Sequence, residues 1–222
     1  MRQVLPPFLL AILVLGCLRP EVRTVQLRPA GPAGPVPLAG AKAFGVRIQV
    51  LDQRPLYERK CGESRDKVAN DTNPLGESRD PTYLSDRSLE VVFREAVEKA
   101  LQALGFREGQ EGDRILTLTL THFYGEIRHY TFVRDRVEAG LELTVALQGT
   151  SGHTLFTGPV KTQVVFKPIK DPTLAVQAAM ERTIERGVAA LVGRPEFRSA
   201  LLRGPAGPAS GSAQPFMGNP IH

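Results

Sequence analysis

The chain of 222 residues has no tryptophan, and its aromatic residues together make up only 6% of the sequence. A core built from such a composition must be modest in size and mostly aliphatic. Long apolar runs are missing as well. The apolar run near the N-terminus, residues 8–15, is too short for a transmembrane helix, which needs about 20 residues.

Cysteine is scarce, because Cys17 and Cys61 are the two cysteines in the sequence. Two cysteines cannot form the disulfide framework of a small secreted domain. None of the four histidines has another histidine or a cysteine three or four positions away, so we expect no zinc or other metal site. The sequence also lacks a nucleophile elbow, a P-loop and a dinucleotide-binding glycine motif. We therefore expect neither a cofactor nor an enzymatic activity.

The net charge of +5 raises the question of nucleic-acid binding. Four of the 28 Lys and Arg residues and one of the 23 acidic residues lie outside residues 42–203, so this segment has a net charge of +2. The remaining excess comes from arginines near the N-terminus. The central segment thus lacks the basic character of a DNA- or RNA-binding domain, and we expect no nucleic-acid partner.

The N-terminus has the pattern of a secretory signal peptide. Arg2 precedes the apolar run, and the small residue Gly16 precedes Cys17. Val14-Leu15-Gly16-Cys17 resembles the lipobox of bacterial lipoproteins. The resemblance implies that residues 1–16 are a signal peptide and that Cys17 becomes the lipid attachment site, carrying acyl chains such as palmitate. Two or more acyl chains anchor a protein stably in a membrane. The alternative is an ordinary signal peptide that happens to contain a cysteine.

Both ends of the mature chain are rich in Pro, Gly and Ala. Such segments lack the apolar content that offsets the entropy lost on folding. We therefore expect a tether at residues 17–41, one folded domain at residues 42–203 and a disordered tail at residues 204–222. An extended tether would reach roughly 75 Å at about 3.1 Å per residue.

Hydrophobic periodicity predicts the first two elements of the domain. Residues 45–51 alternate between apolar and polar, which is typical of a half-buried strand. From Ser85 to Gly105 the period becomes helical, with Ser85 as the expected N-cap and Gly105 as the expected C-terminal cap. The predicted buried stripe of this helix comprises Leu89, Val92, Phe93, Ala96, Val97, Ala100, Leu101 and Leu104.

Three strands and a second helix follow in the pattern. Residues 116–120, 137–147 and 155–166 alternate as strands, and Asp171-Pro172 is a typical helix start. The predicted order is β-α-β-β-β-α. It indicates an α+β fold in two layers, with a four-stranded, mainly antiparallel sheet and two helices on one face, flanked by disordered ends.

These features together resemble the YajG-like lipoproteins, a bacterial family of poorly assigned function. The resemblance consists of the lipobox and of a domain at roughly residues 42–192, in which a first strand ends in Asp52-x-Arg54 and a helix closes on Ala103-Leu104-Gly105-Phe106. It implies a lipoprotein of the cell envelope. Leu18, in place of an aspartate, implies the outer membrane with the domain facing the periplasm. The lipopolysaccharide-assembly lipoproteins share the order of elements and are the alternative family.

Two segments are candidates for recognition. Residues 53–84 form a long polar stretch, predicted as a loop, that repeats Gly-Glu-Ser-Arg-Asp; the alternative is two similar surface turns. Residues 123–134 combine aromatic and arginine side chains, which dominate binding hot spots; the alternative is that the aromatics extend two strands into the core. The candidate binding residues there are Arg128, Tyr130, Phe132 and Arg134.

From the sequence we therefore predict a non-catalytic lipoprotein anchored to a membrane through Cys17. Its domain would bind or help to assemble another envelope component, either a protein or a glycan. A lipopolysaccharide-assembly lipoprotein and an envelope hydrolase without a recognisable motif are the rival functions.

Overall fold

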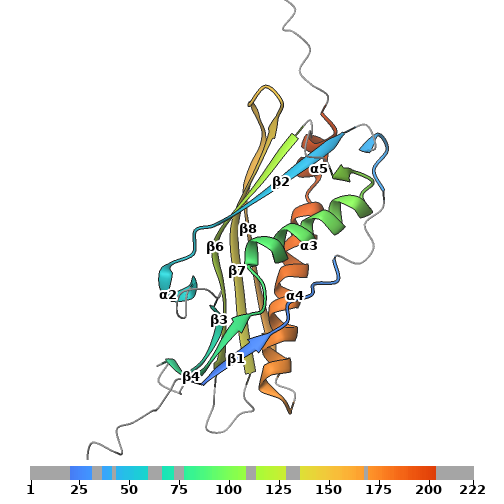
Figure 1. The fold of residues 1–222 in the computed structure, drawn as a ribbon. Coiled ribbons are helices and arrows are strands. Elements are labelled where there is room, and N and C mark those ends of the chain that lie inside the picture. Colours follow the sequence, from blue (N-terminus) through green and yellow to red (C-terminus); the bar gives the residue numbers. More distant parts are fainter. Residues whose placement is uncertain are drawn as a thin grey trace, which may run out of the picture.

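The computed structural model describes residues 21–31, 37–41, 44–59, 67–72, 78–108, 114–128, 136–167 and 170–203. Within these residues, eight strands form one mixed sheet, and α3, α4 and α5 cover one of its faces (Figure 1). The predicted α+β class and the single helical layer are confirmed. The predicted signal peptide, Cys17, Cys61 and the tail at 204–222 lie outside the described residues.

Three long strands form the antiparallel centre of the sheet: β6 (Arg114–Arg128), β7 (Arg136–Gly149) and β8 (Thr154–Phe166). A β-bulge interrupts β6 between Leu120 and His122. Because of this extra residue, Leu120 and Phe123 both point into the core although they are three positions apart. Beyond the bulge, the polar side chains of β6 alternate on the opposite face.

The second edge of β6 is shared by two strands. β2 (Gly45–Asp52) runs parallel to the first half of β6, and β3 (Lys67–Thr72) runs parallel to its last residues. β4 (Ser78–Ser85) pairs antiparallel with β3, while β1 (Val22–Val25) and β5 (Arg107–Glu108) pair parallel with β4 and β2. The prediction of four mainly antiparallel strands is therefore wrong.

The additional elements come from segments without clear periodicity. β3, the one-turn helix α2 (Leu56–Arg59) and all of β4 except its last residue lie within residues 53–84, for which the sequence predicts a loop. The two strands are polar, and Pro81 interrupts the pattern in β4. Proline is expected in edge strands and at irregularities rather than in the interior of a sheet. Pairing with β6 and β1, not local preference, makes these residues strands.

The main helices agree with the predicted stripes, with one change of cap. α3 (Leu89–Ala103) has Ser88 as its N-cap instead of Ser85, and the Ser88 hydroxyl accepts a hydrogen bond from the Val91 amide. Ser85 instead stabilises the preceding turn, where it accepts from the Arg87 amide. At the other end Gly105 has a φ of 93°, the left-handed conformation predicted for this cap.

A second helical pair completes the layer on the same face. α4 (Pro172–Val192) begins at Asp171, whose carboxylate accepts a hydrogen bond from the Thr173 amide at 2.8 Å. α5 (Pro195–Leu202) follows as a separate helix, so the described residues contain three main helices instead of two. α4 packs closely on β7, since a Cβ atom at Gly187 would collide with the Leu141 side chain.

Residues 21–31 belong to the domain, although they lie in the segment predicted as a tether. Val25 and Leu27 are fully buried. The Arg28 amide donates to Glu181 of α4 at 2.7 Å, and Lys99 of α3 donates to the Pro29 carbonyl at 3.0 Å. Burial of the two apolar side chains, together with these bonds to both helices, offsets the entropy lost on ordering.

A buried arginine lies at the junction where the strand paired with β6 changes from β2 to β3. The Arg54 side chain is fully buried and forms an ion pair with Asp52 at 2.8 Å. Its guanidinium also donates to the carbonyls of Glu58, Lys67 and Phe123, at 3.2, 3.0 and 3.1 Å. Arg54 thus joins β2, α2, β3 and β6, which is a structural role for the Asp52-x-Arg54 motif.

Candidate functional site

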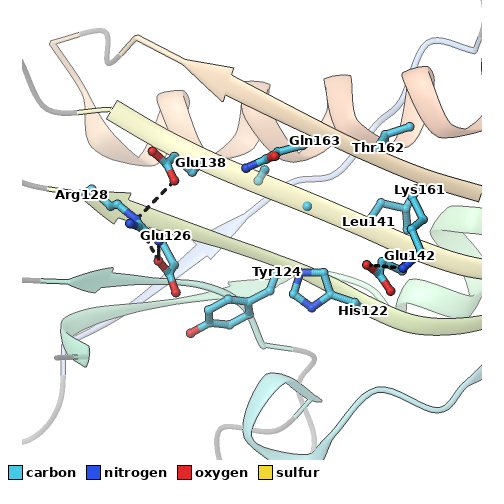
Figure 2. Close-up of a pocket in the computed structure, with 12 residues that line it drawn as sticks. His122, Tyr124, Glu126, Arg128, Glu138, Leu141, Glu142, Lys161, Thr162 and Gln163 are labelled. Carbon is cyan, nitrogen blue, oxygen red and sulfur yellow. Dashed lines mark hydrogen bonds and ion pairs between the residues drawn. The ribbon is translucent and has the colours of Figure 1, made fainter. Parts of the chain in front are cut away.

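The face of the sheet opposite the helices carries an open groove of about 470 Å³ across β6, β7 and β8 (Figure 2). Its lining is polar, in contrast to the aliphatic core on the other face. The side chains on this open face come from three strands: His122, Tyr124, Glu126 and Arg128 of β6, Glu138 and Glu142 of β7, and Lys161 and Gln163 of β8.

Two local features of the backbone create the groove. The bulge after Leu120 turns His122 and the alternate residues that follow it toward the open face. Gly140 then leaves the centre of β7 without a side chain. A Cβ atom at Gly140 would lie 3.0 Å from Nε2 of His122, so the imidazole ring occupies the space above this glycine.

Charged side chains form exposed pairs at both ends of the groove. At one end, Arg128 lies 3.0 Å from Glu126 and 3.3 Å from Glu138, which also pairs with Arg136 at 2.6 Å. At the other end, Lys161 lies 2.9 Å from Glu142. The hydrogen bond from Lys161 holds the pKa of the Glu142 carboxyl below its usual value.

α2 positions the His122 side chain through Glu58. Its Nδ1 lies 2.8 Å from a carboxylate oxygen of Glu58, whose side chain is only 5% exposed. The second carboxylate oxygen of Glu58 is buried without a partner among the described residues. The hydrogen bond to Glu58 raises the pKa of His122, and the charges of Glu58 and Glu142 add to this effect, while burial and Arg54 oppose it.

Tyr124 provides an aromatic surface in the middle of the groove. The ammonium group of Lys67 lies 5.4 Å from the centre of its ring, within the range of a cation–π interaction. Strand pairing places these groups next to one another. β3 brings Lys67 beside β6 and its Tyr124 ring, and β7 brings Glu138 beside Arg128.

One of the four predicted binding residues can be placed. Arg128, the last residue of β6, lines the groove, whereas Tyr130, Phe132 and Arg134 lie outside the described residues. Tyr124 lies within the predicted recognition segment 123–134, whereas His122 and the polar faces of β7 and β8 are not among the predicted binding residues. Alternation marks Glu138 and Glu142 as exposed, but the groove depends on the bulge and on Gly140, for which the sequence has no clear signal.

Within the described residues, no group of three or more His, Cys, Asp or Glu side chains is arranged to hold a metal ion. No helix in this part of the chain is long and apolar enough to span a membrane.

Comparison with known proteins points to a lipoprotein. A family model described as an uncharacterized lipoprotein matches residues 39–201, whereas no curated protein is recognisably similar. A crystal structure of a protein from Xanthomonas campestris has 16% sequence identity and a TM-score of 0.54, covering 81% of this chain and 94% of the other. A minor lipoprotein from Acinetobacter baumannii has 7% identity and a TM-score of 0.43, covering 73% and 97%. At 16% identity, the Xanthomonas structure supports the fold alone.

Proposed function

This chain belongs to the uncharacterized lipoprotein family, as its resemblance to the YajG-like lipoproteins predicted, and from this premise we propose a non-catalytic binding role. The protein is anchored to the outer membrane by lipid on Cys17, with its domain in the periplasm. The groove on the open face of the sheet binds an extended segment of another envelope protein.

The observation that carries this proposal is the uncovered face of the central strands. The helices bury the opposite face, whereas the groove face presents Tyr124, Arg128 and carboxylates (Figure 2). Tyr and Arg are enriched at the centres of protein interfaces. The exposed ion pairs contribute little to stability by themselves, so Arg128 and Lys161 can exchange their present partners for groups of a bound segment at small cost.

The charges of the groove favour a partner segment that carries both signs. Acidic and basic side chains alternate along it, from Arg128 and Glu138 at one end to Glu142 and Lys161 at the other. A uniformly anionic or cationic ligand would meet like charges at either end. A polypeptide with spaced acidic and basic residues satisfies both ends, and its backbone offers donors and acceptors to Gln163 and Tyr124.

The hydrolase remains the rival because of the His122–Glu58 pair, which resembles an oriented general base. In the described part of the chain, however, no hydroxyl or thiol lies within hydrogen-bond distance of His122. Nucleophilic catalysis needs such a group next to the base. The half-buried imidazole therefore has no side-chain nucleophile beside it to activate, and its position on the groove fits a binding surface.

Site-specific photocrosslinking in cells tests the proposal. A photoreactive residue at Gln163, within the groove, is expected to crosslink to an envelope protein, and one at Arg47, an exposed position on β2, is not. The double variant Tyr124→Ala/Arg128→Ala is expected to weaken capture of that protein by about thirtyfold or more, the effect of losing one hot spot of about 2 kcal/mol.

A matched control separates binding from folding. The variant Arg47→Ala/Gln49→Ala removes exposed side chains outside the groove and should leave both capture and the melting transition unchanged. Full capture by a folded groove variant would refute the proposal. Capture of a glycan in place of a protein would change the partner class, and turnover of envelope material that is lost in His122→Gln would support the hydrolase.

A further inference from the structure

The position of β1 shortens the link between the proposed lipid anchor and the domain. The Glu21 carbonyl accepts a hydrogen bond from the Thr82 amide at 2.8 Å, and β1 then pairs with β4. Between Cys17 and Glu21 lie only residues 18–20. Four residue steps span at most about 14 Å, compared with the roughly 75 Å expected of a free tether.

The start of β1 lies at the end of the domain where β8 ends and α4 begins (Figure 1). This end exposes three large apolar side chains: Val22 is 44% exposed, Val165 is 55% exposed and Leu174 is 53% exposed. Val165 follows the buried Val164 and therefore lies on the open face of the sheet, whereas Leu174 belongs to the helical layer. The exposed apolar side chains thus surround this end of the domain, and such a concentration at one end indicates an interaction surface more strongly than scattered side chains do.

Two lysines accompany these apolar side chains. Lys167 follows β8 and Lys170 precedes α4, and both are exposed without an ion pair among the described residues. Two acidic residues at this end are engaged in other interactions, since Glu21 pairs with Arg23 and Asp171 caps α4. This end therefore combines exposed apolar side chains with two exposed lysines, the combination found on proteins that rest on anionic membranes.

We propose that this anchor-side patch, consisting of Val22, Val165, Lys167, Lys170 and Leu174, rests on the surface of the phospholipid bilayer in which Cys17 is anchored. The inference depends on the acylation of Cys17 proposed above. The short link holds the patch at a high effective concentration at the membrane, so weak contacts are sufficient. The lysines face anionic headgroups, and the apolar side chains reach the headgroup boundary.

The orientation has a consequence for the groove. Arg128 lies at the end of β6 where it pairs with Arg136 of β7, and Val137 pairs with Phe166 at the end of β8. The Arg128 end of the groove is thus the end near the bilayer, and Lys161 is farther away. A segment that fills the groove must approach along the membrane surface, which favours a partner that is itself bound to the membrane.

Fluorescence quenching on vesicles tests the proposal. The full acylated protein, with Cys61→Ser, is placed in vesicles of phosphatidylglycerol and phosphatidylethanolamine that contain a lipid-borne quencher. A fluorophore on Leu174→Cys is expected to be quenched. A fluorophore on Ala103→Cys, exposed at the end of α3 far from the patch, is expected to stay bright. Equal brightness at both positions would overturn the proposal.

A longer link isolates the affinity of the patch itself. With about twenty Gly and Ser residues inserted between Pro20 and Glu21, a length that frees the domain from its anchor, quenching at position 174 should persist at low salt. Lys167→Gln and Lys170→Gln should each lower the ratio of docked to undocked protein about fivefold. The matched variant Arg47→Gln, which also removes one positive charge from an exposed position, should not change it. If the insertion abolished quenching in a protein whose patch is unaltered, the patch would have no measurable affinity of its own. This result would refute its docking role.

Flotation separates this inference from the anchoring on which it depends. Protein that fails to float with the vesicles shows that Cys17 carries no lipid, which would overturn the anchoring. Protein that floats but is not quenched at position 174 would overturn the docking alone.

Discussion

Replacing Arg54 by Met removes the charge that joins four elements while keeping a side chain of similar length. In the native protein, the Arg54 guanidinium binds both carboxylate oxygens of Asp52, at 3.0 and 2.8 Å, and three backbone carbonyls. Both side chains of the pair are buried, at 0% and 8% exposure. Removing one partner of a buried pair costs about 3–5 kcal/mol, because the other charge is left unpaired.

We therefore expect Arg54→Met to lower the free energy of unfolding by about 3–5 kcal/mol. This is a large part of the stability of a typical domain, about 5–15 kcal/mol. The loss includes the unpaired carbonyls of Glu58, Lys67 and Phe123, which water reaches only after the junction opens. The measurement is urea unfolding at neutral pH of the full chain carrying Cys17→Ser, which keeps the protein free of lipid.

The chain contains its own control for this experiment. Glu21 and Arg23 form the same acid-x-Arg pair at 2.7 Å, but their side chains are 56% and 35% exposed. An exposed pair contributes about 0–1 kcal/mol, so Arg23→Met should change stability little. If Arg54→Met cost no more than Arg23→Met, the proposed role of Arg54 at the junction would be wrong.

Three further predictions concern the groove and the core. The hydrogen bond that His122 donates to Glu58 raises the pKa of His122 above its unfolded value. The stability from this pair should therefore be complete below about pH 6.5 and disappear as the pH rises through the folded pKa. The difference in unfolding free energy between wild type and His122→Gln should shrink accordingly as the pH rises, and a constant difference between about pH 5 and 9 would contradict this. Gly187→Ala should cost about 1–3 kcal/mol, because the new methyl collides with Leu141, and a more stable variant would refute the close packing. Leu101→Ala should cost about 2–5 kcal/mol, since Leu101 is 4% exposed; a loss within about 0.5 kcal/mol in denaturant unfolding would remove it from the core.

The helices could be predicted from the sequence because their signals are local. The stripe from Leu89 to Leu101 lies on the buried face of α3, Gly105 has the expected positive φ, and Asp171-Pro172 begins α4. Each of these features depends on residues within one or two turns of the chain. Ser85 and Ser88 show the limit of such signals, since two serines three residues apart are equally suitable caps.

The candidate groove could be predicted only in part. Arg128 was identified as a binding residue and lines the groove, but His122 was considered only as a metal ligand and set aside. Its place beside Glu58 depends on a bulge in β6 and on the docking of α2. Neither the bulge nor the docking of α2 can be recognised from the alternation of β6. The extra residue shifts the alternation of apolar and polar residues by one position without ending it.

The sequence by itself determined the α+β class, the three long strands and the two main helices, because periodicity and caps act over a few residues. Only the tertiary structure decided that β1, β3 and β4 are strands, since these polar or irregular segments gain their hydrogen bonds from partners far along the chain. The same long-range pairing places Val22 beside Thr82, so that a segment with the composition of a free tether becomes part of the sheet. Backbone pairing and burial of Val25 and Leu27 supply the free energy that composition alone does not reveal.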